Sequence, residues 1–106
     1  MKPSIGRIVH YKLSVYDLAE IVRRRHELSR AGGAHLEMAA DQVLPMLIVK
    51  VHGDHPNSAV NGHVFLDGDD TLFVSSRLLG EAAGTWSWPA IVPPATPVGV
   101  AYGDRI

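Results

Sequence analysis

Three consecutive arginines, Arg23, Arg24 and Arg25, form the longest run of like charge in the sequence. An arginine side chain is a planar fork of N–H donors, which matches the oxygens of a phosphate group. Successive helix residues point about 100° apart, so the three side chains cannot all face one ligand. Two of them could form a phosphate site with Arg30 or with a loop residue. The alternative is a solvated helix surface whose positive charge complements the helix dipole.

Two tryptophans offer aromatic surface. Trp86 and Trp88 are separated only by Ser87, so both rings are expected on the same face of a short strand. A ring exposed there could stack on a nucleotide base, which is worth about 1–3 kcal/mol per base. The alternative is an anchor of the core or of an interface, because tryptophan is large and apolar. Asn61 and His63, on another predicted strand, complete the predicted ligand-binding residues.

Histidines and acidic residues suggest metal chemistry, but their spacing argues against it. His10 and His63 could share a sheet face, and neutral imidazoles bind zinc or iron well. However, the sequence has no H-E-x-x-H motif. The acidic turn at residues 67–70 is not an EF-hand loop, because Leu72 and Leu78 stand where glycine and glutamate are required. We therefore predict no metal site and a solvated hairpin turn.

Catalytic motifs are also missing from the sequence. There is no cysteine and no G-x-S-x-G nucleophile motif. The acidic residues fall mostly in predicted turns or on the predicted helix, which does not suggest a pair of carboxylates across a cleft. We predict a protein that is not an enzyme and needs no cofactor. A small hydrolase or metal enzyme using His52, His55, His63 or the acidic turn is the remaining alternative.

The elements that must position these residues are mostly strands. Residues 5–13 alternate, with Val9, Tyr11 and Leu13 on one face, which predicts a half-buried strand. Helix formers follow over residues 15–30, after a capping-box spacing from Ser14 to Asp17 and before a Gly-Gly stop. The predicted apolar stripe of this helix consists of Val15, Leu18, Ile21, Val22 and Leu28.

Four more strands are predicted over residues 46–51, 59–67, 71–76 and 85–89. The continuous apolar run at residues 46–51 predicts a central strand buried on both faces. Gly62 suggests a bulge or a close backbone approach. The pattern predicts an α+β fold, most simply a small SH3-like β-barrel of four to five strands with one helix inserted after the first strand.

Residues 1–91 form one predicted domain, and residues 92–106 form a Pro/Gly-rich tail whose Val98, Val100 and Tyr102 could dock on a partner subunit.

Composition restricts the possible partners and the location. The formal net charge of the 106 residues is −1, which argues against general nucleic-acid binding but leaves room for a local basic cluster. The N-terminal segment has no apolar signal core, and no apolar run is long enough to span a membrane. We therefore expect a cytoplasmic protein without a membrane partner.

Several segments resemble, in order, an uncharacterised family of small phage and prophage accessory proteins. The matching runs are MKPSIGRIVHY (residues 1–11), IVRRR (21–25), LPMLIV (44–49), VNGHVFLDGDD (60–70) and GTWSWP (84–89). The resemblance covers most of residues 1–89 but not the tail, and Val22 stands where the family more often carries a polar residue. It implies a phage setting, the host cytoplasm, but transfers no catalytic residue.

Two functions follow from these observations. The first is an anti-defence sponge that sequesters a nucleotide-derived immune signal, such as a cyclic nucleotide or an ADP-ribose derivative, between the protomers of a homo-oligomer. Residues 23–25 would hold its phosphates, and Trp86 or Trp88 would stack its base. The second is a protein–protein interaction or virion accessory module that binds a host or phage protein, with the tryptophans as interface anchors.

Overall fold

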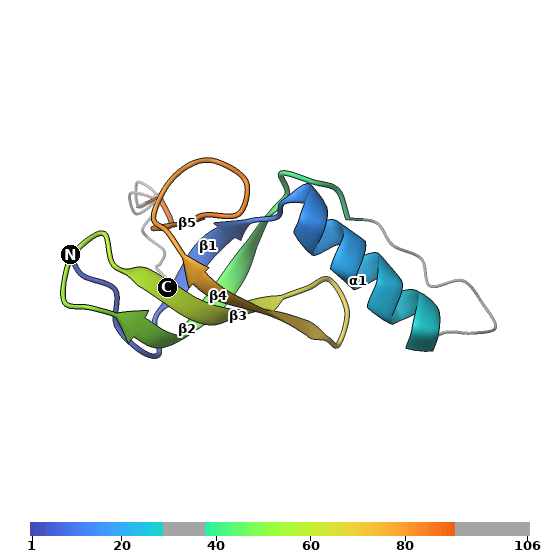
Figure 1. Cartoon of the computed structure of the whole chain (residues 1–106), viewed down its shortest axis with the longest axis horizontal. Coiled ribbons are helices and arrows are strands. Elements are labelled where there is room, and N and C mark those ends of the chain that lie inside the picture. The colour runs from blue at the N-terminus through green and yellow to red at the C-terminus, as the bar shows by residue number, and fades with distance from the viewer. Residues whose placement is uncertain (29–37, 91–106) are drawn as a thin grey trace, which may run out of the picture.

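The computed structural model describes residues 1–28 and 38–90, apart from the side chain of Leu28. Within these residues, five strands form one antiparallel sheet in the order β4-β3-β2-β1-β5, and a single helix follows the first strand. Figure 1 shows the helix beside one end of the sheet, near the turn between β3 and β4. The elements are β1 (Ile8–Lys12), α1 (Val15–Leu28), β2 (Val43–His52), β3 (Ala59–Phe65), β4 (Thr71–Arg77) and β5 (Trp86–Ser87). The predicted α+β class is therefore confirmed.

The sheet is not closed into the predicted barrel. Strands β4 and β5 are its two edges. The chain that leaves β4 does return toward β5, where Leu79 and Trp86 form an isolated bridge. That single bridge does not make a strand ladder, because β5 has only two residues.

Each strand buries one set of alternating side chains, which we call the inner face, and turns the other set, the outer face, away from the core. Alternation is expected of strands in an antiparallel sheet with one buried side. The inner face consists of Val9, Tyr11, Leu44, Met46, Ile48, Val60, Val64, Leu72, Val74 and Trp86. The outer face consists of Ile8, His10, Lys12, Val43, Pro45, Leu47, Lys50, His52, Asn61, His63, Phe65, Thr71, Phe73 and Ser87.

Strand β2 is central, as predicted, but the prediction that both of its faces are buried is wrong. Met46 and Ile48 have no solvent exposure, whereas Val49 and Lys50 are exposed. A continuous apolar run cannot distinguish a strand covered on both sides from one covered on a single side. On the outer side of β2, Leu47 is half-buried and Val43, Pro45 and Lys50 are exposed.

Gly62 marks a close approach between β3 and β2, as predicted. A Cβ atom built on Gly62 would lie 2.5 Å from the Met46 Cγ and 2.8 Å from the carbonyl oxygen of Leu47. Register shifts lie next to it, between Ile48 and Lys50 and between Val60 and Gly62. Glycine lets Met46 fill the inner face here without pushing the strands apart.

Helix α1 begins with the predicted capping box. The Asp17 backbone N–H donates to the Ser14 Oγ (3.1 Å), and the Ser14 N–H donates to the Asp17 Oδ2 (2.9 Å). Of the predicted apolar stripe, Ile21 is fully buried and Leu18 packs against the core. Val15 and Val22 are exposed, so their predicted burial is wrong. The predicted helix end at Arg30 and the C-terminal tail lie outside the described residues.

Candidate binding face

The structure places the seven predicted ligand-binding residues in three separate regions. Arg23, Arg24 and Arg25 lie on α1, Trp86 and Trp88 lie at β5, and Asn61 and His63 lie on the outer face of β3. Arg23 is exposed on the helix and pairs with Glu20 (2.7 Å) and Glu27 (3.1 Å). Its hydrogen bond with Glu20 lowers the pKa of that carboxyl and raises the pKa of Arg23.

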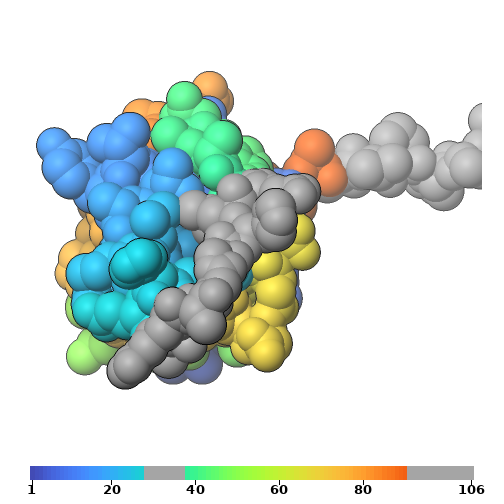
Figure 2. All heavy atoms as spheres, turned by 90° about the vertical axis from the view of Figure 1, so that its right-hand side faces the viewer, coloured from blue at the N-terminus to red at the C-terminus, as the bar shows by residue number. Residues whose placement is uncertain are grey.

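The other two arginines contact the turn between β3 and β4. Figure 2 shows the helix (blue to cyan) and this turn (yellow) on the same face of the molecule. Arg25 forms a two-point contact with Asp70, with Nη2–Oδ1 and Nε–Oδ2 distances of 2.6 and 3.1 Å, and donates to the Asp67 carbonyl. Arg24 donates to the Thr71 carbonyl (2.8 Å). The Arg25 hydrogen bond holds the pKa of Asp70 below its ordinary value. This predicted phosphate-binding pair therefore connects α1 to the sheet.

Trp86 belongs to the core, whereas Trp88 lies at its margin. The Trp86 side chain has no solvent exposure, so it offers no ring face to a ligand in this conformation. Trp88 is half-buried and meets Trp86 edge to face, with ring centroids 5.4 Å apart. The Arg7 guanidinium lies 4.9 Å from the centre of the Trp88 ring, a cation–π arrangement. Alternation alone could not show which tryptophan fills the core.

Asn61 and His63 lie on the outer face and are held in place by neighbours. The Asn61 Oδ1 accepts the Ser76 N–H at 2.7 Å and lies 2.9 Å from the His52 Nε2. The His63 ring lies 5.3 Å from the ring of Phe73 on β4, tilted by 52°. These contacts fix two polar side chains while leaving the face accessible.

One row of side chains crosses four strands of the outer face. Backbone pairing aligns Ile8 with Leu47, Leu47 with His63, and His63 with Phe73. The two ends of the row are well exposed, at 48% for Ile8 and 53% for Phe73. Paired residues on one sheet face have Cβ atoms roughly 5 Å apart, so the row is continuous. Other exposed apolar residues of the same strands are Val43, Val49 and Phe65.

Charge is unevenly distributed around this apolar row. None of the five strands contains an aspartate or a glutamate. Their outer face carries five basic or potentially basic side chains: Lys12, Lys50, His10, His52 and His63. The acidic residues of the described chain lie on α1 and in the connecting loops. Although the net charge of the chain is near zero, the five strands carry basic side chains and no acidic ones.

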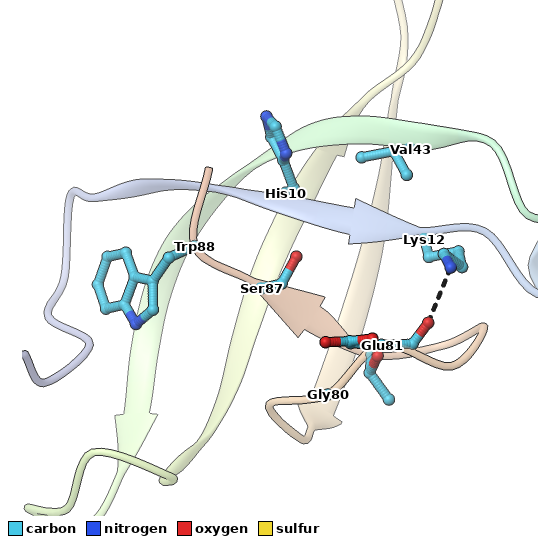
Figure 3. Close-up of a pocket in the computed structure, with 8 residues that line it drawn as sticks. His10, Lys12, Val43, Gly80, Glu81, Ser87 and Trp88 are labelled. Atoms are coloured by element: carbon cyan, nitrogen blue, oxygen red, sulfur yellow. Dashed lines mark hydrogen bonds between the residues drawn. The ribbon is translucent and has the colours of Figure 1, made fainter. Parts of the chain in front are cut away.

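A shallow pocket of about 370 Å³ lies at the β1–β5 end of the outer face. Figure 3 shows His10 and Lys12 on β1 beside Ser87 on β5, with Trp88 at one side and Glu81 at the other. The Lys12 Nζ donates to the Glu81 carbonyl at 2.8 Å, which holds the side chain across the opening. The pocket joins a cation, an imidazole and hydroxyl groups to one aromatic wall.

The described residues suggest neither a metal centre nor a membrane span. Nowhere in residues 1–28 and 38–90 do three or more histidine, aspartate or glutamate side chains form a group able to hold a metal ion. No helix of the described part is both long and apolar enough to cross a membrane. No protein-family model, curated protein or solved structure matches this chain.

His10 and His63 share a sheet face, as predicted, but the sequence did not indicate how many apolar side chains lie on that face with them. The missing signal was present in the alternation itself. Ile8, Phe65 and Phe73 each alternate with residues that the structure buries, such as Val9, Val64 and Val74, so each lies on the opposite side. Strand pairing was needed to show that Ile8 and Phe73 belong to one row.

Proposed function

We propose that the protein is a non-catalytic interaction domain that binds a partner protein through the outer face of its sheet. The observation that carries this proposal is the continuous row of Ile8, Leu47, His63 and Phe73. Single exposed apolar residues are common on protein surfaces and require no explanation. A row that spans four strands and ends in two half-exposed large side chains is a contiguous patch, and such patches mark binding surfaces.

The resemblance to phage accessory proteins supports a host or phage protein as the partner, in the host cytoplasm. An SH3-like arrangement, opened instead of closed, is the architecture that we propose. The strand order β4-β3-β2-β1-β5 and the return of the chain from Leu79 to Trp86 support it. In an open sheet the outer face is broad and shallow, which suits a protein surface better than a small ligand.

The proposal is tested by capture from a host lysate with the wild-type chain and two variants. Ile8→Thr/Phe73→Thr removes the two ends of the row but keeps β-branched residues in the strands. Tyr16→Thr is the matched control, because Tyr16 is an aromatic residue on α1 with 84% exposure. We expect mass spectrometry to find proteins that wild type and Tyr16→Thr retain and the double variant loses. Identical captured sets for all three chains would overturn the proposal.

A second candidate is the nucleotide sponge, and the pocket at the β1–β5 end favours it. Lys12 and His10 would hold a phosphate there, and Trp88 and Glu81 are also among the residues that line the pocket. The pocket is shallow, so tight capture would require a second protomer, which supports the expected homo-oligomer. Arg23 and its carboxylate partners Glu20 and Glu27 are exposed on α1. In this candidate, Arg23 would contribute to a phosphate site formed between the α1 helices of two protomers.

Thermal unfolding with cyclic dinucleotides, cyclic trinucleotides and ADP-ribose derivatives tests this candidate. A ligand that binds only the folded state raises the melting temperature by mass action. The sponge predicts a clear rise with one compound, lost in Lys12→Met/Trp88→Leu and accompanied by oligomers in sedimentation. A flat panel at millimolar ligand would exclude it.

A further inference from the structure

We propose that the partner presents an acidic surface with apolar side chains to the outer face. This inference rests on the proposed function and names the chemistry of the partner. Its basis is the combination of an apolar row with basic groups at both ends of a face whose strands carry no carboxylate. Complementary charge around an apolar centre is the usual way in which an interface selects its partner.

The two lysines of the outer face lie on opposite sides of the row. Lys12 is at the end of β1, paired with Val43, and Lys50 is beyond the bulge of β2, paired with Asn61. Lys50 is exposed and forms no ion pair within the described residues. Lys12 uses one ammonium hydrogen on the Glu81 carbonyl, which leaves two for another acceptor. Both cations can therefore meet carboxylates of a partner centred on the row.

The acidic residues nearest this face lie in the connecting loops and not on its strands, and Asp41, Asp67 and Asp69 are exposed there. Asp70, at the turn after β3, is committed to Arg25, and Asp54, next to the end of β2, is committed to Lys2 at 2.7 Å. Glu81 reaches the pocket and is the one carboxylate among its lining residues, close to Lys12 but at the margin of the face. The row itself contains only His63 as an ionisable residue, and its next neighbours along the strands on this face include His10 and Lys50 but no carboxylate.

Other occupants fit less well. A second copy bound face to face would oppose Lys12 and Lys50 of one copy with the same cations of the other, which is unfavourable. A single-stranded nucleic acid would require exposed ring faces on which bases stack. Here Phe73 is the one well-exposed phenyl ring of the row, and Ile8 and Leu47 are aliphatic, so the row offers no series of rings on which successive bases could stack. An acidic polypeptide can use both the apolar row and the cations.

The test is a selection from a random dodecapeptide library displayed on particles, performed against the full chain. We expect the enriched peptides to carry net negative charge and at least one large apolar residue. The same selection against Lys12→Glu/Lys50→Glu should enrich peptides of net positive charge, while Ile8→Thr/Phe73→Thr should enrich none. For one enriched acidic peptide, we expect each double variant to weaken binding roughly tenfold or more. Tyr16→Thr should bind like wild type.

The outcomes separate the inference from the function on which it rests. Peptides that depend on Ile8 and Phe73 but have no charge preference would overturn the acidic partner and leave the interaction domain intact. Peptides that bind all variants equally, or no enrichment at all, would count against both. Binding of an oligo-dT strand in place of acidic peptides would replace the proposed partner with a nucleic acid. Self-association lost in Ile8→Thr/Phe73→Thr would replace it with a second copy.

Discussion

The two faces of the sheet are built from the same strands but differ in composition and in burial: the inner face is apolar and buried, whereas the outer face mixes apolar, basic and other polar side chains that are partly or well exposed. The inner face buries Trp86 and Tyr11 completely. The buried Tyr11 hydroxyl donates to the Asp17 Oδ2 at 2.6 Å, whereas the buried Trp86 Nε1 has no hydrogen-bond partner within the described residues. The outer face leaves Ile8 and Phe73 half-exposed. Large apolar side chains therefore occur on both faces, but within the described residues only those of the inner face are almost completely buried.

The largest effect that tests this comparison is expected at the inner face. Trp86→Ala should lower the free energy of unfolding by about 3–5 kcal/mol, because it removes a fully buried indole and leaves a cavity. Urea unfolding followed by circular dichroism measures the change. Trp88→Ala is the control and should cost clearly less, since that ring is half-buried. Equal costs for the two variants would show that Trp86 is not the anchor of the core.

The close approach at Gly62 should give the next largest effect. Gly62→Ala places a methyl group 2.5 Å from the Met46 Cγ and 2.8 Å from the Leu47 carbonyl oxygen, so β2 and β3 must move apart. We expect a loss of about 1–3 kcal/mol of stability, the range of overpacked cores.

Two further variants show where that cost arises. The cost of Gly62→Ala should fall in part in a Met46→Ala background, because the side-chain clash disappears while the backbone clash remains. Gly80→Ala, where the nearest atom would be the Thr85 Cγ2 at 3.3 Å, should cost less in the same urea titration. A Gly62→Ala chain as stable as wild type would mean that the sheet tolerates a wider spacing and that Met46 is not confined.

Much of the inner face could be predicted from the sequence, because burial leaves a local signal. Alternation located the strands and identified Val9 and Tyr11 as inward-facing, and the capping box located the start of α1. The outer face and the role of the arginines depend on pairings between distant residues. Arg25 and Asp70 are 45 positions apart, so the run of arginines looked available for phosphate when much of it was committed to the hairpin. A local pattern reports what a side chain can do, whereas its partner is decided by the tertiary fold.

The contact between α1 and the hairpin should have an intermediate effect with a defined pH dependence. The hydrogen bond from Arg25 lowers the pKa of Asp70 in the folded state. The ion pair therefore stabilises the fold above the ordinary carboxyl pKa, roughly 4, and this stability is lost as the pH falls through the lowered folded value. We expect Asp70→Asn to cost about 1–2 kcal/mol at pH 7, as for a partly buried two-point pair.

Urea titrations from pH 7 to pH 2.5 measure this linkage. The difference between wild type and Asp70→Asn should shrink toward zero at the acidic end. Asp54→Asn is the control: it removes an exposed ion pair with Lys2 and should change stability by less than about 0.5 kcal/mol. A constant difference between wild type and Asp70→Asn across the pH range would mean that the aspartate acts through packing and not through its charge.

The smallest effect on stability is expected where the proposed effect on function is largest. Phe73→Thr on the outer face should change the free energy of unfolding by no more than about 0.5 kcal/mol, since the ring is more than half exposed and threonine suits a strand. The same substitution should weaken partner binding, which calorimetry with an enriched peptide would measure. Substitution of a core residue would instead cause a large loss in the free energy of unfolding and no separate loss of partner affinity. If Phe73→Thr instead unfolded the chain as Trp86→Ala should, the outer face would be a second core surface covered by residues outside the described part. The free energy of unfolding and the partner affinity of this one variant therefore decide whether the outer face binds a partner or differs from the inner face only in solvent exposure.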